Sequence, residues 1–162
     1  MKTFKELLIE LNACKDAREW AGDKSWEECY ATCHRGDWFL WLFKRTNPDD
    51  LQLLTLAKGH CANTVRHLMK DERSLKAVDA AIAFGEGKIS RDELDAAAYF
   101  AADAANAAYA AAAYAAAAAA NAAPAAAAYA AYAAYVAKKE IQQLTADICR
   151  KYLPIEVWNI TK

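Results

Sequence analysis

Five cysteines and three histidines are the residues whose types come closest to metal or nucleophile chemistry. Cys29 and Cys33 stand four positions apart, and His34 follows them. Together with His60 and Cys61, these residues could supply the ligands of a zinc site. Cysteines at i and i+4 of a helix lack the two-residue spacing of a zinc knuckle. No flanking motif marks either cysteine as an activated nucleophile. We therefore expect no metal site, no cofactor and no thiol catalysis.

Acidic residues gather where the alanine-rich half begins, with Asp92, Glu93 and Asp95 close to one helical turn. Negative charge in the first turn of a helix is stabilised by the helix dipole, so these carboxylates need no role in acid–base catalysis. The five glycines are scattered and form no phosphate-binding loop. We expect that the protein is not an enzyme and that it acts by binding.

Polar and aromatic side chains follow one stripe of the alanine-rich segment. Residues 96–137 hold 30 alanines in 42 positions, and alanine is the strongest helix former. At 100° per residue, the polar and aromatic side chains of this segment fall within a stripe roughly 80° wide or directly beside it. The stripe is either a solvated face or the lining of a binding groove. Its candidate binding residues are Tyr99, Asp103, Asn106, Tyr109 and Tyr114.

Two further candidate binding residues, Arg35 and Asp37, flank Gly36. We interpret this tripeptide as a helix break, with Arg35 near the end of one helix and Asp37 as the cap of the next. Residues 38–43 (WFLWLF) are apolar on all sides, which predicts a fully buried helix. The core is expected to include four of the tryptophans: Trp20, Trp26, Trp38 and Trp41.

The elements that position these residues are expected to be helices throughout. Apolar spacing in the first half predicts short amphipathic helices at residues 4–11, 13–21, 25–35, 38–43, 50–69 and 75–84. Ser25 with Glu28, and Ser90 with Glu93, have the spacing of capping boxes and mark two helix starts. No useful length of chain alternates with period 2, so we expect no strand.

Pro124 divides the alanine-rich half. Proline costs about 3 kcal/mol inside a helix but is tolerated in the first turn. The break predicts two long helices, residues 90–121 and 124–153, folded as an αα-hairpin. The expected fold is an all-α, single-domain, multi-helix bundle. It has short helices in residues 1–89, the alanine-rich hairpin in residues 90–154 and a tail in residues 155–162.

Composition narrows the expected partners and location. A net charge of −1 gives no general attraction to nucleic acid or to an anionic membrane. The stretch at residues 107–120 has no charged or amide side chain, but its 14 residues are too few to span a bilayer. The chain start has no secretory pattern, and an odd number of cysteines does not favour a disulfide framework. We expect a cytoplasmic protein without nucleic-acid or membrane partners, and the oligomeric state stays open.

Several segments stand out by their order along the chain. They are ACKDAREWA at residues 13–21, CHRGDW at 33–38 continued by LWL at 40–42, the Ala/Tyr/Asp-rich tract, and ADICR at 146–150. Together they resemble bacterial immunity proteins of polymorphic-toxin systems, which also occur in phage and prophage settings. The R-G-D-W segment joined to the Trp/Leu helix carries most of the resemblance. The resemblance implies a cytoplasmic inhibitor that blocks a toxin by direct binding.

Two functions follow from these observations. The first is an immunity or anti-effector protein that binds a bacterial toxin or effector stoichiometrically and inhibits it. The alternative is a protein that binds or sequesters a small, nucleotide-like molecule in phage–host conflict, because tyrosine, tryptophan and polar side chains can stack on such a ligand and hydrogen-bond to it. A tight 1:1 complex would support the first, and a ligand-induced rise in melting temperature the second.

Overall fold

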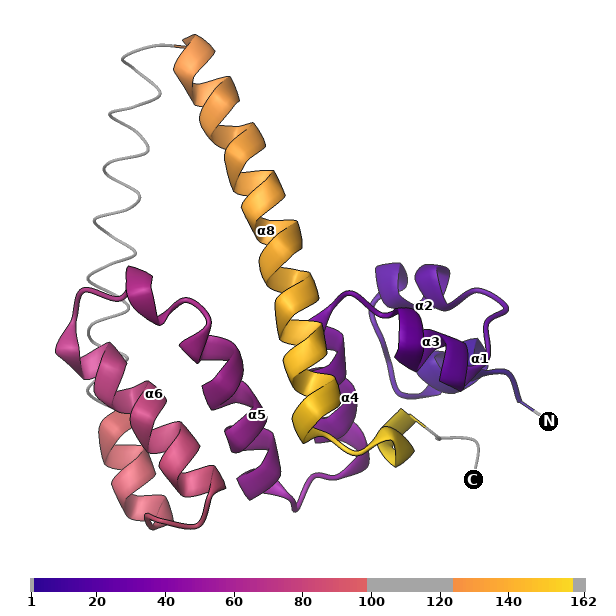
Figure 1. Ribbon diagram of the computed structural model, residues 1–162. Coiled ribbons are helices and arrows are strands. Elements are labelled where there is room, and N and C mark those ends of the chain that lie inside the picture. The colour runs from indigo at the N-terminus through magenta and orange to yellow at the C-terminus, as the bar shows by residue number, and fades with distance from the viewer. Residues whose placement is uncertain (1, 99–123, 159–162) are drawn as a thin grey trace.

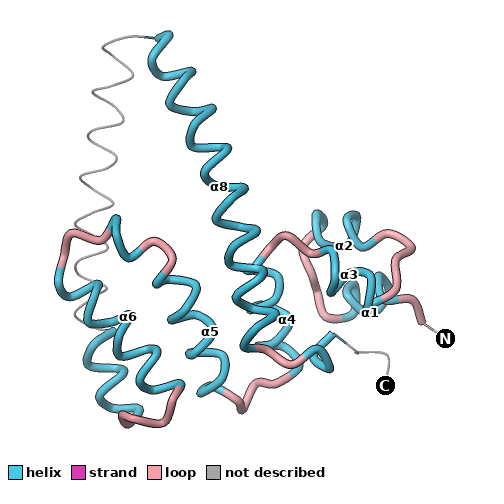
Figure 2. The backbone as a smooth tube through the Cα atoms, viewed as in Figure 1, coloured by secondary structure: helices cyan, strands magenta, loops and turns pink. Residues whose placement is uncertain are grey.

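The computed structural model describes residues 2–98 and 124–158, and within these ranges the chain forms helices and loops but no strand (Figures 1 and 2). The prediction of an all-α fold is confirmed. Residues 91–98 are also helical. The named elements are α1 (Phe4–Glu10), α2 (Lys15–Ala21), α3 (Trp26–Thr32), α4 (Gly36–Thr46), α5 (Leu51–Asn63), α6 (Glu72–Gly85), α8 (Pro124–Tyr152) and the 3₁₀ helices η1 (Arg66–Leu68) and η2 (Ile155–Trp158).

Both predicted capping boxes are confirmed. Ser25 Oγ accepts a hydrogen bond from the Glu28 amide at 3.2 Å, and the Glu28 carboxylate accepts one from the Ser25 amide at 2.8 Å. The same reciprocal pair joins Ser90 and Glu93, at 3.3 and 2.8 Å. Each pair satisfies backbone donors that have no partner inside the first turn of a helix.

Some helix ends differ from the prediction. The helix expected over residues 25–35 ends at Thr32, because Cys33 has extended backbone angles. The helix expected over residues 50–69 is divided into α5 and η1. There the Thr64 hydroxyl donates to the Cys61 carbonyl at 2.7 Å, a side-chain bond that competes with a further helical turn. Asp37 is not the cap of α4; Arg35 has the extended cap conformation and Asp37 lies in the first turn.

The long helix α8 organises the fold. α4 and α5 both pack on it, and α6 packs on α5, while α1, α2 and α3 gather on the other side of α4 (Figure 1). After α8 the chain turns into η2, which packs against α3 and α4. The end of α8 therefore joins the N-terminal helices to the rest of the domain.

The predicted alanine-rich hairpin is only partly within the described residues. α8 spans Pro124–Tyr152 and agrees with the predicted second arm. The first arm is described only over residues 91–98, so the pairing of the two arms lies outside the described residues. In the part of the chain that the structure describes, no helix is both long and apolar enough to cross a membrane.

Two helix crossings bring backbones close together at glycines. A Cβ atom added to Gly36 would lie 2.5 Å from Thr145 Oγ1 and 2.7 Å from the Thr145 carbonyl carbon. A Cβ atom added to Gly85 would lie 2.6 Å from the Cα atom of Leu56. Glycine is therefore needed where α4 meets α8 and where α6 meets α5.

The prediction that residues 38–43 form a helix buried on all sides is wrong. Phe39, Leu42 and Phe43 are 1%, 2% and 0% exposed and form the largest part of the core. Trp38 and Trp41, on the other side of α4, are only half-buried. The reason is that α8 and α5 cover one face of α4, whereas the opposite face borders an open cavity. All four tryptophans assigned to the core pack against it without being fully buried.

Candidate functional site

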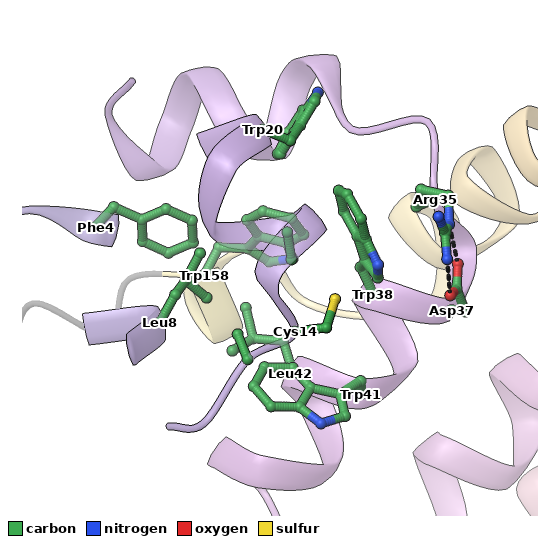
Figure 3. Close-up of a pocket in the computed structure, with 12 residues that line it drawn as sticks. Phe4, Leu8, Cys14, Trp20, Arg35, Asp37, Trp38, Trp41, Leu42 and Trp158 are labelled. Carbon is green, nitrogen blue, oxygen red and sulfur yellow. Dashed lines mark hydrogen bonds and ion pairs between the residues drawn. The ribbon is translucent and has the colours of Figure 1, made fainter. Parts of the chain in front are cut away.

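An open cavity of about 290 Å³ lies among α1, α2, α4 and η2 (Figure 3). Its walls are mainly aromatic and aliphatic, and one charged pair stands at its rim. Concave, largely apolar sites with a few polar groups are the usual form of binding sites. The lining residues are Phe4, Leu8, Ala13, Cys14, Ala17, Trp20, Arg35, Asp37, Trp38, Trp41, Leu42 and Trp158.

Helical spacing places the tryptophans on the cavity walls. Trp38 and Trp41 are three residues apart and share a face of α4, and Trp20 comes from the last turn of α2. The rings of Trp20 and Trp38 meet with centroids 5.5 Å apart and planes inclined by 56°. Ala17, one turn before Trp20, also lines the cavity, and its small side chain fills little of it.

Trp158 forms the inner wall of the cavity. Its ring stacks on Phe4, with centroids 5.7 Å apart, and lies 4.8 Å from the Phe39 ring. Residues 155–158, expected as part of a tail, form η2 and carry this buried side chain into the N-terminal cluster. A segment from the end of the chain therefore holds α1 beside α4.

Arg35 and Asp37, both predicted as binding residues, form a two-bond ion pair on the rim. Arg35 Nε donates to Asp37 Oδ1 at 2.7 Å and Nη2 donates to Oδ2 at 2.6 Å. These hydrogen bonds lower the pKa of Asp37 and raise the pKa of Arg35, so both groups are charged at neutral pH. The Asp37 side chain is 58% exposed and can accept further hydrogen bonds from a ligand.

A cation lies over each of the three half-buried tryptophans that line the cavity. The Arg35 guanidinium carbon is 4.7 Å from the Trp38 ring centroid, and Lys24 Nζ is 4.7 Å from that of Trp20. Arg45 lies over Trp41 at 5.7 Å. Such cation–π contacts fix the rings. The charge of Arg35 is paired with that of Asp37, so Lys24 and Arg45 supply the positive charge beside the cavity. The site can therefore accept an apolar or aromatic group that carries an acidic group beside it.

Arg150 of α8 fixes the turn that leads into the rim. Its Nε donates to the Tyr30 carbonyl at 3.0 Å, and Nη2 donates to the carbonyls of Ala31, at 3.3 Å, and Cys33. Its Nη1 pairs with Asp147 at 2.7 Å. The last carbonyls of a helix have no partner within it, so this single guanidinium caps α3. Arg35 follows directly from that capped end.

The cysteine and histidine set considered for metal binding is dispersed. Cys29 and Cys33 are buried, and desolvation raises the pKa of each thiol to about 11, which disfavours the thiolate that binds metals. His60 stacks on Tyr152 with ring centroids 4.2 Å apart, and burial lowers its pKa. Among the described residues, no three Cys, His, Asp or Glu side chains are arranged to hold a metal ion.

Only part of the predicted site can be placed. Arg35 and Asp37 lie together on the cavity rim. The remaining five candidates lie outside the described residues: Tyr99, Asp103, Asn106, Tyr109 and Tyr114.

From the sequence, the tryptophans were expected in the core and were not considered as site residues. A signal for them was present in α4. Trp38, Trp41 and Arg45 recur at i, i+3 and i+7 and form one stripe, whereas Phe39 and Phe43 lie on the opposite side of the helix. A stripe of tryptophans that ends in an arginine favours an exposed binding face over a core face.

Trp41→Ala is expected to lower the free energy of unfolding by only about 1–2 kcal/mol, because the ring is half-buried at a cavity that is already open. Phe43→Ala, which truncates a fully buried ring of the same helix, should cost about 3–5 kcal/mol. Urea denaturation of both variants measures the difference. Equal losses would place Trp41 in the core and remove it from the site.

The Arg35–Asp37 pair should make stability depend weakly on acid pH. The folded-state pKa of Asp37 is lowered, so the pair stabilises the fold above the unfolded carboxyl pKa of about 4 and loses this contribution as the pH falls through the folded-state pKa. Because the Asp37 side chain is 58% exposed, the free energy of unfolding of wild type should exceed that of Asp37→Asn by less than about 1 kcal/mol at neutral pH. Denaturation of wild type and Asp37→Asn between about pH 7 and pH 2 measures this dependence. A difference in the free energy of unfolding that grows towards acid pH would contradict it.

Comparison of the chain with protein-family models, with curated proteins and with solved structures finds no match in any of the three. The fold and the cavity together define an all-α domain with an open aromatic site and a charged rim.

Proposed function

We propose that the protein is a cytoplasmic immunity or anti-effector protein that binds one bacterial toxin or effector stoichiometrically and inhibits it through the aromatic cavity. One observation carries this proposal: three half-buried tryptophans, each with a cation over its ring, border an open cavity. Tryptophan and arginine are enriched at the positions where protein interfaces concentrate their binding energy. Ring pockets already fixed in the free protein also reduce the entropy lost on binding.

The position of the R-G-D-W segment supports the same proposal. The resemblance to immunity proteins depends most on residues 35–38 and the Trp/Leu helix that follows. In the structure, Arg35, Asp37 and Trp38 form the rim of the cavity, and Trp41 and Leu42 line its wall. The segment that suggests the family is therefore also the segment that forms the candidate contact site.

The partner's contact can be stated in chemical terms. A cavity of about 290 Å³ accommodates one large apolar or aromatic side chain. Lys24 over Trp20 and Arg45 over Trp41 favour a carboxylate next to that side chain, whereas Arg35 over Trp38 is already paired with Asp37. We therefore expect the toxin or effector to insert an aromatic or aliphatic residue flanked by Asp or Glu.

Growth rescue tests this function. The toxin or effector encoded beside this gene in its native genome is co-expressed with the wild-type chain, which should protect the cells and form a 1:1 complex by light scattering. Trp38→Ala should abolish protection, because it removes a wall of the cavity. The control is Arg66→Ala, which removes another two-bond ion pair, with Asp79 at 2.5 and 3.0 Å, distant in sequence from the cavity. Full protection by folded Trp38→Ala would contradict the proposal.

A small-molecule ligand is the second candidate function, and the size of the cavity favours it. The volume lies near the lower end of the range for ligand sites, roughly 300 Å³, and the ring faces of Trp20 and Trp38 could stack on a planar base. Asp37 could accept hydrogen bonds from the edge of that base. Melting curves with a panel of nucleosides and nucleotides separate the two functions: a rise that is lost in Trp38→Ala would favour the ligand.

A further inference from the structure

Two thiols from different helices face each other away from the aromatic cavity. Cys61 Sγ of α5 lies 3.8 Å from Cys149 Sγ of α8, and the two residues are 88 positions apart in the sequence. Cys61 Sγ also lies 3.7 Å from the Thr145 carbonyl oxygen, and Cys149 Sγ lies 3.6 Å from that of Gly36. Both are free thiols, so the pair is in its reduced form.

The two thiols differ in access to solvent. Cys149 is fully buried, whereas Cys61 is partly exposed. A groove of about 600 Å³ between α4 and α8 is lined by Cys61 together with Leu40, Ile141 and Thr145. Cys149 does not line this groove. A small oxidant that enters the groove therefore reaches Cys61 first.

The more accessible thiol, Cys61, is also the more acidic of the two. The hydrogen bond between the two thiols lowers the pKa of Cys61. The same bond and burial raise the pKa of Cys149, so Cys149 retains its proton. Because the thiolate is the reactive form of cysteine, Cys61 is the nucleophile of the pair.

We propose that Cys61 is an oxidation site at which a peroxide closes a disulfide to Cys149 and so links α5 to α8. The Cys61 thiolate attacks one oxygen of hydrogen peroxide, the O–O bond breaks, and Cys61 becomes a sulfenic acid while the departing hydroxide takes up a proton as water. Cys149 sulfur then attacks Cys61 sulfur, loses its proton and expels a second water as the S–S bond forms. The thiols lose two electrons and the peroxide gains them.

The cross-link would join two helices that already pack together. It closes a loop of 88 residues, which restricts the unfolded chain and should raise the melting temperature by about 5–15 °C. It also draws Cys149 Sγ away from the carbonyl of Gly36, which lies between Arg35 and Asp37. In a reducing cytoplasm such a bond is transient and reports oxidation.

Peroxide treatment of the folded full-length chain tests the proposal. Cys14 is exposed, so the experiment uses Cys14→Ser, which places a better capping residue at the start of α2. Mass spectrometry should show the loss of two hydrogen atoms and a cross-linked peptide pair containing Cys61 and Cys149. The melting temperature should rise by about 5–15 °C, and a thiol reductant should reverse both the cross-link and this rise.

Two further variants assign the roles. In Cys149→Ala, Cys61 should accumulate as a sulfenic acid that a carbon nucleophile captures, whereas Cys61→Ser should leave Cys149 unoxidised. The peroxide treatment of the Cys14→Ser chain tests the proposal whether or not these two variants fold. Retention of all four thiols in the peroxide-treated Cys14→Ser chain, or a disulfide between Cys29 and Cys33 instead, would overturn the proposal.

Discussion

Arg150→Met is expected to lower the free energy of unfolding by about 3–4 kcal/mol, because it leaves three backbone carbonyls without their donor. The arginine side chain is only 20% exposed, and its guanidinium binds the carbonyls of residues 30, 31 and 33 at the end of α3. It also lies 5.1 Å from the Phe39 ring centroid. Methionine retains most of the packing of the side chain and removes every donor.

The matched control for Arg150 is its neighbour on α8. Lys151 is exposed and lies over the ring of Tyr152 at 5.2 Å. Lys151→Met should change the free energy of unfolding by less than about 0.5 kcal/mol. Urea denaturation of both variants gives the comparison. A loss below about 1 kcal/mol for Arg150→Met would show that the carbonyls find other partners, and that α8 does not hold the turn before the cavity rim.

Gly36→Ala is expected to destabilise the fold by about 3 kcal/mol, even though alanine is the better helix former by about 1 kcal/mol. The added methyl carbon would lie 2.5 Å from Thr145 Oγ1 and 2.7 Å from the Thr145 carbonyl carbon. A side chain can rotate away, but the backbone of α8 cannot. Thr145→Ser combined with Gly36→Ala should therefore recover only part of the loss.

A glycine with softer surroundings provides the control for Gly36. A Cβ atom at Gly59 of α5 would lie 2.9 Å from Ile82 Cγ1 and 3.1 Å from the Ile82 amide nitrogen, so its nearest backbone atom is farther away than the 2.7 Å at Gly36. Gly59→Ala should therefore cost less than Gly36→Ala, about 1–2 kcal/mol, because a smaller shift relieves the contact and the helix gains propensity. Equal effects at the two glycines would contradict the close contact between α4 and α8.

The parts of the fold predicted correctly from the sequence depend on local signals. Ser25 with Glu28 and Ser90 with Glu93 form their capping boxes within one turn, so spacing alone identifies them. The absence of period-2 alternation likewise sufficed to predict an all-α fold for the described ranges. The end of α5 was missed because a single hydroxyl, that of Thr64, interrupts an otherwise helical pattern.

The parts that could not be predicted depend on partners far apart in the sequence. Arg150 caps a helix that ends about 120 residues earlier, and Trp158 reaches Phe4 from the other end of the chain. Neither residue differs in its local sequence from an ordinary arginine or tryptophan. Arg35 and Asp37 were chosen as candidates because they flank a glycine at a helix break, and the structure places both on the cavity rim. Their ion pair joins side chains two positions apart, so it depends on no distant partner.

Hydrogen–deuterium exchange of the free protein and of its complex with the proposed toxin or effector tests the central claim most directly. Binding through the aromatic cavity predicts slower exchange in α2 and the first two turns of α4, where Trp20, Trp38 and Trp41 lie. It predicts unchanged exchange in α6, which packs on α5 on the other side of α8 from this cavity. Protection confined to α6, with none in α2 or α4, would contradict the account.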